Sequence, residues 1–105
     1  MKKFKVKIDP EALTDIREAT DWYNQQQPEL GERFQRTTVK QIDSLNKDPH
    51  IYAIRYEEIR CMIIDKFPFM VHFYINKQDH SVEVLAVINT GKNPEVWFQK
   101  TKRKG

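Results

Sequence analysis

Residues 59–88 read IRCMIIDKFPFMVHFYINKQDHSVEVLAVI, and this stretch decides the fold. Three apolar runs of strand length are separated in it by two polar turns, Asp65–Pro68 and Asn76–His80. Strands joined by connections this short pair antiparallel, because a parallel crossover needs a dozen residues or more. With a short strand expected just before the stretch, the predicted strands cover 54–57, 59–64, 69–75 and 82–88.

The first half of the chain has a different period. Phe4–Ile8 alternates apolar residues with lysines, which is typical of a half-buried strand at the edge of a sheet. Helical spacing then predicts a helix over 10–26, started by an Asp-Pro pair, and a second over 28–47, ended by another Asp-Pro pair. Gly31 lies on the apolar face of the second helix, where it permits close contact between the two helices.

These elements predict one α+β domain over residues 1–105. It comprises an N-terminal strand, an αα-hairpin and an antiparallel sheet of three to four strands. A length of 105 residues with 39% hydrophobic residues suits a single core. After the sheet, a turn of helix is expected over 95–100, anchored by Trp97 and Phe98.

Composition excludes several classes of protein. The longest uncharged apolar stretch, 67–75, is far shorter than the roughly 20 residues of a membrane span. The N-terminus has no apolar segment of the kind found in secretory signals, and the single cysteine, Cys61, excludes an intrachain disulfide. We therefore expect a cytoplasmic protein without a membrane association.

The net charge of +3 suits nucleic acid or an acidic protein as a partner without establishing either. Basic residues gather at the two ends of the chain. They either increase solubility or attract an acidic partner. This basic set comprises Lys2, Lys3, Lys5, Lys7, Lys100, Lys102, Arg103 and Lys104.

Arg60 sets the expected orientation of its strand, because side chains alternate across a strand and a charge avoids the core. With Arg60 turned away from the helices, Cys61 points inward and Met62 outward. The next two strands are oriented by the same alternation. The predicted inward set is Ile59, Cys61, Ile63, Phe69, Val71, Phe73, Ile75, Val82, Val84, Ala86 and Ile88.

The predicted outer face mixes apolar and polar side chains, which is typical of a partner surface. Alternatively, the C-terminal segment with Trp97 and Phe98 folds back over part of it, and we expect both to apply. Two roles are open for Arg60: a structural ion pair with Glu83 across the sheet, or a role in the functional site. Candidate partner-binding residues are Met62, Met70, Leu85, Asn89 and Trp97.

The sequence argues against the common catalytic sites. A nucleophilic Cys–His pair needs both side chains within hydrogen-bond reach, whereas Cys61 and His72 are expected on opposite faces. The three histidines lack the spacing of a metal site, and no phosphate-binding or serine-nucleophile motif occurs. No metal or other cofactor is expected.

Four segments carry a resemblance to a known family. They are VKIDPEALTDIREATDWYNQQ at 6–26, LGERFQRTTVKQIDSLNKDP at 30–49, YEEIRCMIIDKFPFMVHFYI at 56–75 and VEVLAVINTGKNPEVW at 82–97. In order and spacing they resemble the RelE/ParE superfamily of bacterial type II toxins, particularly its ParE-like, or plasmid stabilisation, branch. The resemblance implies a cytoplasmic toxin that is neutralised by a cognate antitoxin, whose disordered region folds on binding.

The resemblance implies two alternative activities. RelE-like members cleave mRNA on the ribosome, whereas ParE-like members inhibit DNA gyrase. The chain keeps the family arginine of the third strand as Arg60, but it has Asn89 and Lys92 where many relatives have histidine and arginine. For RNA cleavage, Arg60 and Lys92 are candidates to hold the phosphate, and His72 or Tyr74 to transfer a proton.

The basic cluster that RelE-like members carry before this arginine is missing, since 51–58 contains only Arg55. We therefore expect a ParE-like toxin that binds a protein target such as DNA gyrase and is not an enzyme. The first alternative is a RelE-like ribosome-dependent mRNA endoribonuclease. The second is a degenerate, non-toxic member that only binds a partner.

Overall fold

A computed structural model of the chain describes residues 3–102, so that Lys2, Arg103 and Lys104 of the basic ends lie outside the described residues. The predicted strand, helical hairpin and sheet are confirmed. A short 3₁₀ helix, η1, was not predicted. The elements are β1 (Lys5–Ile8), α1 (Pro10–Gln26), α2 (Leu30–Ser44), η1 (Pro49–Ile51), β2 (Ile54–Tyr56), β3 (Ile59–Ile63), β4 (Phe69–Asn76), β5 (Ser81–Asn89) and α3 (Pro94–Lys100).

Within the described residues, five strands form one sheet in the order β1-β5-β4-β3-β2. The strands from β2 to β5 pair antiparallel, as predicted, whereas β1 pairs parallel with β5. The two helices carry the chain between β1 and the rest of the sheet, which is the length of connection that a parallel pair requires. The lysine-bearing strand β1 lies at an edge, as its sequence predicted.

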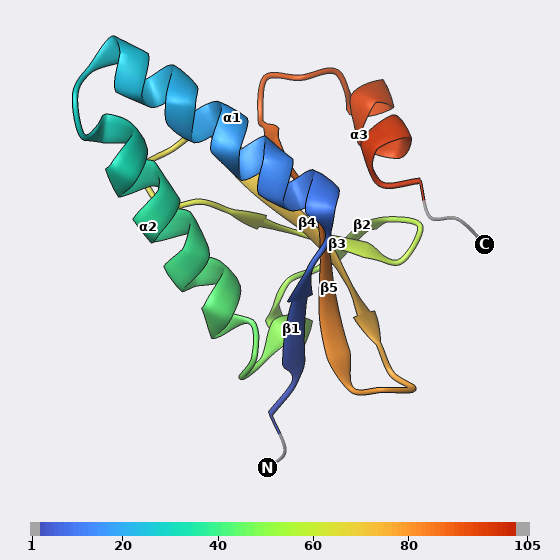
Figure 1. Ribbon diagram of the computed structural model, residues 1–105. Coiled ribbons are helices and arrows are strands. Elements are labelled where there is room, and N and C mark those ends of the chain that lie inside the picture. The colour runs from blue at the N-terminus through green and yellow to red at the C-terminus, as the bar shows by residue number, and fades with distance from the viewer. Residues whose placement is uncertain (1–2, 103–105) are drawn as a thin grey trace.

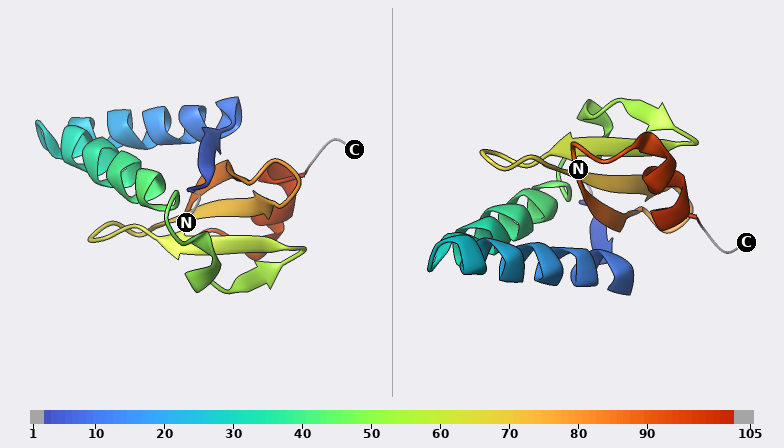
Figure 2. Two further views of the ribbon diagram at one scale, coloured as in Figure 1. Left: turned by 90° about the horizontal axis from the view of Figure 1, so that it is seen from below. Right: turned by 90° about the horizontal axis from the view of Figure 1, so that it is seen from above.

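The main core lies between the sheet and the helical hairpin (Figures 1 and 2). α1 and α2 run side by side across one face of the sheet. Tyr23 and Phe34 of the helices meet Phe67 and Phe69 in an aromatic cluster with ring centroids 5.0–6.1 Å apart. This burial of apolar and aromatic surface is the main source of stability for the hairpin.

Gly31 lies where α2 approaches α1 most closely. A Cβ atom at this position would lie 2.1 Å from the backbone oxygen of Thr20 and 2.6 Å from Oδ1 of Asn24. The Gly31 N–H donates a hydrogen bond to that same Oδ1 at 2.8 Å. The predicted close contact between the helices at Gly31 is therefore confirmed, and only glycine fits there.

The predicted orientation of β3 is wrong. Met62 and Ile64 are buried in the main core, whereas Cys61 lies opposite His72 on the other face and Ile63 is 63% exposed. The arginine misled the prediction because its long side chain reaches from the core face to the carbonyl oxygens of Tyr52 and His50. Ile59, on the face of Cys61, is nevertheless buried.

A β-bulge changes the orientation of β5 partway along. Val84 lies opposite Phe73, but Ala86 lies opposite His72, so Leu85 is the extra residue. Val82 and Val84 face the helices as predicted. Beyond the bulge the prediction is wrong: Val87 joins the main core, Asn89 pairs with Phe69 of the core face, and Ala86 and Ile88 lie on the other face.

α3 packs on the face opposite the helical hairpin, through ring contacts of Trp97 with Tyr56 and His72. The expected return of the C-terminal segment over this face is thus confirmed. Lys100, at the end of α3, forms an ion pair with the buried carboxylate of Asp15 on α1. Among residues 3–102, no helix combines the length and apolar character that crossing a membrane requires.

Candidate functional site

A polar cluster lies beneath α3 on the face of the sheet opposite the hairpin. His72 of β4 is fully buried, and its Nδ1 lies 2.8 Å from the hydroxyl of Tyr56. That hydroxyl lies 3.1 Å from Oγ1 of Thr101, just after α3. The sulfur of Cys61 lies 3.5 Å from the same Nδ1. The cluster therefore joins β2, β3, β4 and the end of α3.

Burial decides the protonation of this cluster. It lowers the pKa of His72 to about 4, with a smaller contribution from the positive charge of Arg55. It also raises the pKa of Tyr56 to about 12. At neutral pH His72 is a neutral imidazole and a weak base, shielded from solvent by Trp97. A proton-transfer role for His72 on RNA would require α3 to move.

The expected placement of Cys61 and His72 on opposite faces of the sheet is wrong. The two side chains share a face and lie within contact distance. The chemistry still argues against a nucleophile. Burial raises the pKa of Cys61 to about 11, so that the thiol stays protonated at neutral pH. A partly buried, neutral thiol beside a neutral imidazole is a structural contact rather than an activated pair.

Arg60 is bound to the backbone of the segment that precedes β2. Its guanidinium donates to the carbonyl oxygen of Tyr52 at 2.6 Å and, more weakly, to that of His50 at 3.4 Å. The alternative in which Arg60 pairs with Glu83 is wrong, because within residues 3–102 the guanidinium donates to backbone oxygens while Glu83 accepts from Tyr74 and Asn76. In this arrangement Arg60 holds the turn around η1 against the sheet.

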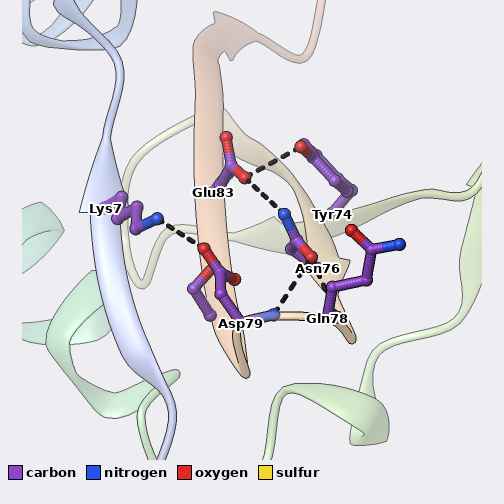
Figure 3. Close-up of polar contacts among 7 residues, drawn as sticks. Lys7, Tyr74, Asn76, Gln78, Asp79 and Glu83 are labelled. Atoms are coloured by element: carbon purple, nitrogen blue, oxygen red, sulfur yellow. Dashed lines mark hydrogen bonds and ion pairs between the residues drawn. The ribbon is translucent and has the colours of Figure 1, made fainter.

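Tyr74 belongs to a polar network near the turn of the β4–β5 hairpin (Figure 3). Its hydroxyl donates to Oε2 of Glu83 at 2.8 Å, and the Asn76 side chain donates to the same oxygen at 3.3 Å. Close by, Lys7 of the edge strand forms an ion pair with Asp79 at 2.7 Å. These contacts tie β1 to the hairpin and hold the Tyr74 hydroxyl in place.

Asn89 and Lys92 lie at the opposite end of β5. They line a hollow of about 350 Å³ together with residues of α1 and α3. Asn89 accepts a hydrogen bond from the backbone of Gly91, which shapes the loop, and Lys92 is exposed. Among the predicted site residues, Asn89 and Lys92 thus lie together here, as His72 and Trp97 do beneath α3.

The four candidate catalytic residues therefore do not form one surface. Arg60 lies on the opposite face of the sheet from His72, His72 is buried, and Tyr74 and Lys92 lie near opposite ends of β5. Within residues 3–102, no three side chains of His, Cys, Asp or Glu come close enough together to hold a metal ion.

The candidate partner-binding residues differ in their accessibility. Met62, Met70 and Leu85 are buried, at 1%, 5% and 5% exposure, and cannot contact a partner in this state. Trp97 is partly buried and anchors α3, with the Arg55 guanidinium 5.8 Å above its ring. Asn89 remains accessible at the edge of the hollow.

Sequence reasoning missed Asp15. Its carboxylate is buried, accepts a hydrogen bond from the backbone N–H of Val87 at 3.0 Å and pairs with Lys100. Asp15 thereby gives a hydrogen-bond partner to the Val87 N–H of β5, which lies beyond the point where the pairing with β1 ends. The sequence did hold a signal for this role. Asp15 precedes Ile16 on the apolar face of the predicted 10–26 helix, and an acidic residue on such a face indicates a buried carboxylate with a partner.

Comparison with known families and structures agrees with this geometry. The family described as "ParE toxin of type II toxin-antitoxin system, parDE" matches residues 6–94. No curated protein sequence matches the chain. A structure of the chromosomal ParDE system from P. aeruginosa is similar, with 19% identity and a TM-score of 0.72, covering 82% of this chain and 95% of that chain.

Two RelE structures show the same fold. A substituted E. coli RelE toxin in the free state is 17% identical, with a TM-score of 0.71 over 98% of both chains. The intact E. coli RelBE toxin-antitoxin complex contains a chain that is 14% identical, with a TM-score of 0.65, covering 85% of this chain and 99% of that chain.

Proposed function

Because this chain belongs to the ParE toxin family of type II toxin–antitoxin systems, we propose that it acts by binding a protein target, such as DNA gyrase. It is a toxin of such a system, and a cognate antitoxin neutralises it. Both events take place in the cytoplasm. The toxin works by occupying a surface of its target rather than by a chemical step.

The observation that carries this proposal is the separation of the residues needed for RNA cleavage. Attack by a ribose 2′-hydroxyl requires a base, an acid and a cation that all reach the same phosphate group. Here Arg60 and His72 lie on opposite faces of the sheet. Tyr74 donates to Glu83, and Lys92 lies in a separate hollow.

Exposed apolar side chains support a role in binding. Several large ones are between 39% and 68% exposed, and a partner that covers them would remove apolar surface from water. They occur on α1, on α2, on the segment around β2, on β3 and on α3. The set comprises Leu13, Trp22, Val39, Ile51, Ile54, Ile63 and Phe98.

Ribosome-dependent mRNA cleavage is the second candidate. It is favoured by the likeness to the E. coli RelE fold over 98% of both chains and by the exposed Lys92. The third candidate is a member that has lost toxicity and only binds a partner. Asn89 and Lys92, at positions where many relatives carry histidine and arginine, favour it.

The antitoxin is expected to be acidic and amphipathic. The net charge of +3 and the lysine-bearing edge strand β1 attract such a segment, and the exposed apolar side chains bind its apolar face. Attraction of this kind weakens as salt increases. Ordering and burial of the segment would give a negative heat-capacity change in calorimetry.

Induction of the protein in bacterial cells tests the proposed mechanism. A gyrase-binding toxin leaves translated mRNA at full length and relaxes plasmid supercoiling within the first generation after induction. Co-expression of the product of the adjacent gene should restore both growth and supercoiling. Rapid mRNA cleavage, with supercoiling unchanged, would support the endoribonuclease instead. Neither effect, with the folded protein present, would support the non-toxic alternative.

A further inference from the structure

The hollow that contains Asn89 and Lys92 is lined by parts of the chain that are far apart in sequence. Its floor is apolar, formed by Val87 and Ile88 at the end of β5, with Phe69 of β4 and Val96 of α3 beside them. Its volume of about 350 Å³ is at the lower end of the range for ligand pockets. It is therefore suited to one anchoring side chain rather than to a whole helix.

Trp22 forms one wall of the hollow from α1. Its side chain is 55% exposed and contacts Tyr23 edge-on, with ring centroids 5.1 Å apart. An indole this open to solvent beside an apolar floor offers apolar surface that a partner can bury. Tryptophan is also the residue that most often dominates the energy of protein interfaces.

The charges around the hollow are asymmetric. Asp15 is already satisfied, because one carboxylate oxygen accepts from Val87 and the other pairs with Lys100. The two charges left at the rim are Glu18 on α1 and Lys92 on the loop after β5. Lys92 forms no ion pair within the described part of the chain. The loop side of the rim is thus positive and the α1 side negative.

This arrangement distinguishes between a peptide and a nucleic acid. A phosphate chain would pass close to the carboxylate of Glu18, which repels it, and would gain little from an apolar floor. A peptide with an apolar side chain and a neighbouring carboxylate satisfies both the floor and Lys92. Its positive or N–H groups can face Glu18.

We propose that this hollow receives an apolar side chain of the antitoxin, and that an adjacent Asp or Glu of the antitoxin pairs with Lys92. The inference rests on the proposed function, because it assigns a surface to the antitoxin that this function requires. It adds the chemistry of the contact and its position between α1, β5 and α3.

The test is calorimetric titration of the full-length protein and its variants with the product of the adjacent gene. Trp22→Ala should weaken binding about tenfold or more, as is typical of a central interface residue. Lys92→Glu should weaken binding to a similar extent, because it places a carboxylate beside the carboxylate of the antitoxin. Lys40→Glu, an equal charge change at an exposed position of α2, is the matched control and should weaken binding no more than about threefold. Circular dichroism shows whether each variant is folded. If Trp22→Ala does not fold, the affinity of Lys92→Glu alone decides the test.

The outcomes separate the inference from the proposed function. Binding by both variants as tight as that of the native chain overturns the inference and leaves the antitoxin function standing. No binding by the native chain overturns both. In a Trp97→Phe background, the emission of Trp22 should shift to shorter wavelength when the adjacent gene product binds. The same shift with a short RNA, and not with that protein, would overturn the inference in favour of a nucleic-acid site.

Discussion

The sulfur of Cys61 lies 3.5 Å from Nδ1 of His72, yet neither group is ionised at neutral pH. Both are held on the face of the sheet that α3 covers, and burial favours the neutral form of each. A pair with the spacing of a catalytic dyad therefore serves as part of the packing beneath the C-terminal helix. This relationship makes two predictions.

The first concerns the reactivity of Cys61. Because its pKa is raised to about 11, alkylation of the native protein should be at least about tenfold slower at pH 8 than alkylation of the unfolded chain. The rate should still be rising above pH 9.5. Stopped assays with iodoacetamide measure it. A native rate that equals the unfolded rate and levels off near pH 8.5 would contradict the buried environment.

The second concerns stability and pH. The pKa of His72 in the folded protein, about 4, is below its ordinary value of 6.5, so between these values the unfolded chain binds more protons. The contribution of His72 to the free energy of unfolding is fully present above pH 6.5. It is lost as the pH falls toward 4, by about 3 kcal/mol at most. Urea unfolding measures the change. His72→Gln should show a smaller loss between pH 7 and 4.5 than the native chain, and an equal loss would contradict the assignment.

The third prediction concerns helix packing. Gly31→Ala places a methyl group 2.1 Å from the Thr20 backbone oxygen, so the helices must separate. We expect a loss of about 2–4 kcal/mol in the free energy of unfolding. Gly91→Ala is the matched control, since its Cβ would come no closer than 3.2 Å, to an exposed side-chain oxygen. Equal effects of the two substitutions would show that the close approach at Gly31 is wrong.

The fourth concerns Asp15. Asp15→Ala leaves the Val87 N–H without a partner and releases Lys100, so it should cost about 2–4 kcal/mol and loosen α3. Asp15→Asn keeps an acceptor for Val87 and should cost less. Hydrogen exchange of α3 and denaturant unfolding measure these effects. If the two variants behave alike and α3 stays protected, Asp15 does not anchor it.

The helices and strands followed closely from the sequence because local signals fix them. α1 begins and ends as predicted, since Pro10 and the polar break after Gln26 act within a few residues. The faces of β3 and β5 did not follow. The bulge at Leu85 depends on how β5 meets its neighbours, and Arg60 reaches a backbone oxygen that comes near only in the folded chain.

The candidate site was predicted least well for the same reason. His72 was predicted on the face away from the helices, but the sequence does not show that Trp97 packs on it there and that it is fully buried. Asn89 and Lys92 were identified through the family resemblance, whereas Asp15 and Trp22, which complete their surroundings, come from α1. Residues that far apart in sequence meet only through the tertiary fold.

The most direct test of the account is a purified assay with translating ribosomes. Labelled mRNA is incubated with ribosomes and the protein, with Arg60→Ala as the matched variant. The account predicts full-length mRNA with both proteins, while the native protein inhibits supercoiling by purified DNA gyrase. Cleavage of the mRNA by the native protein, abolished in Arg60→Ala, would contradict the central claim that this toxin acts by binding a protein.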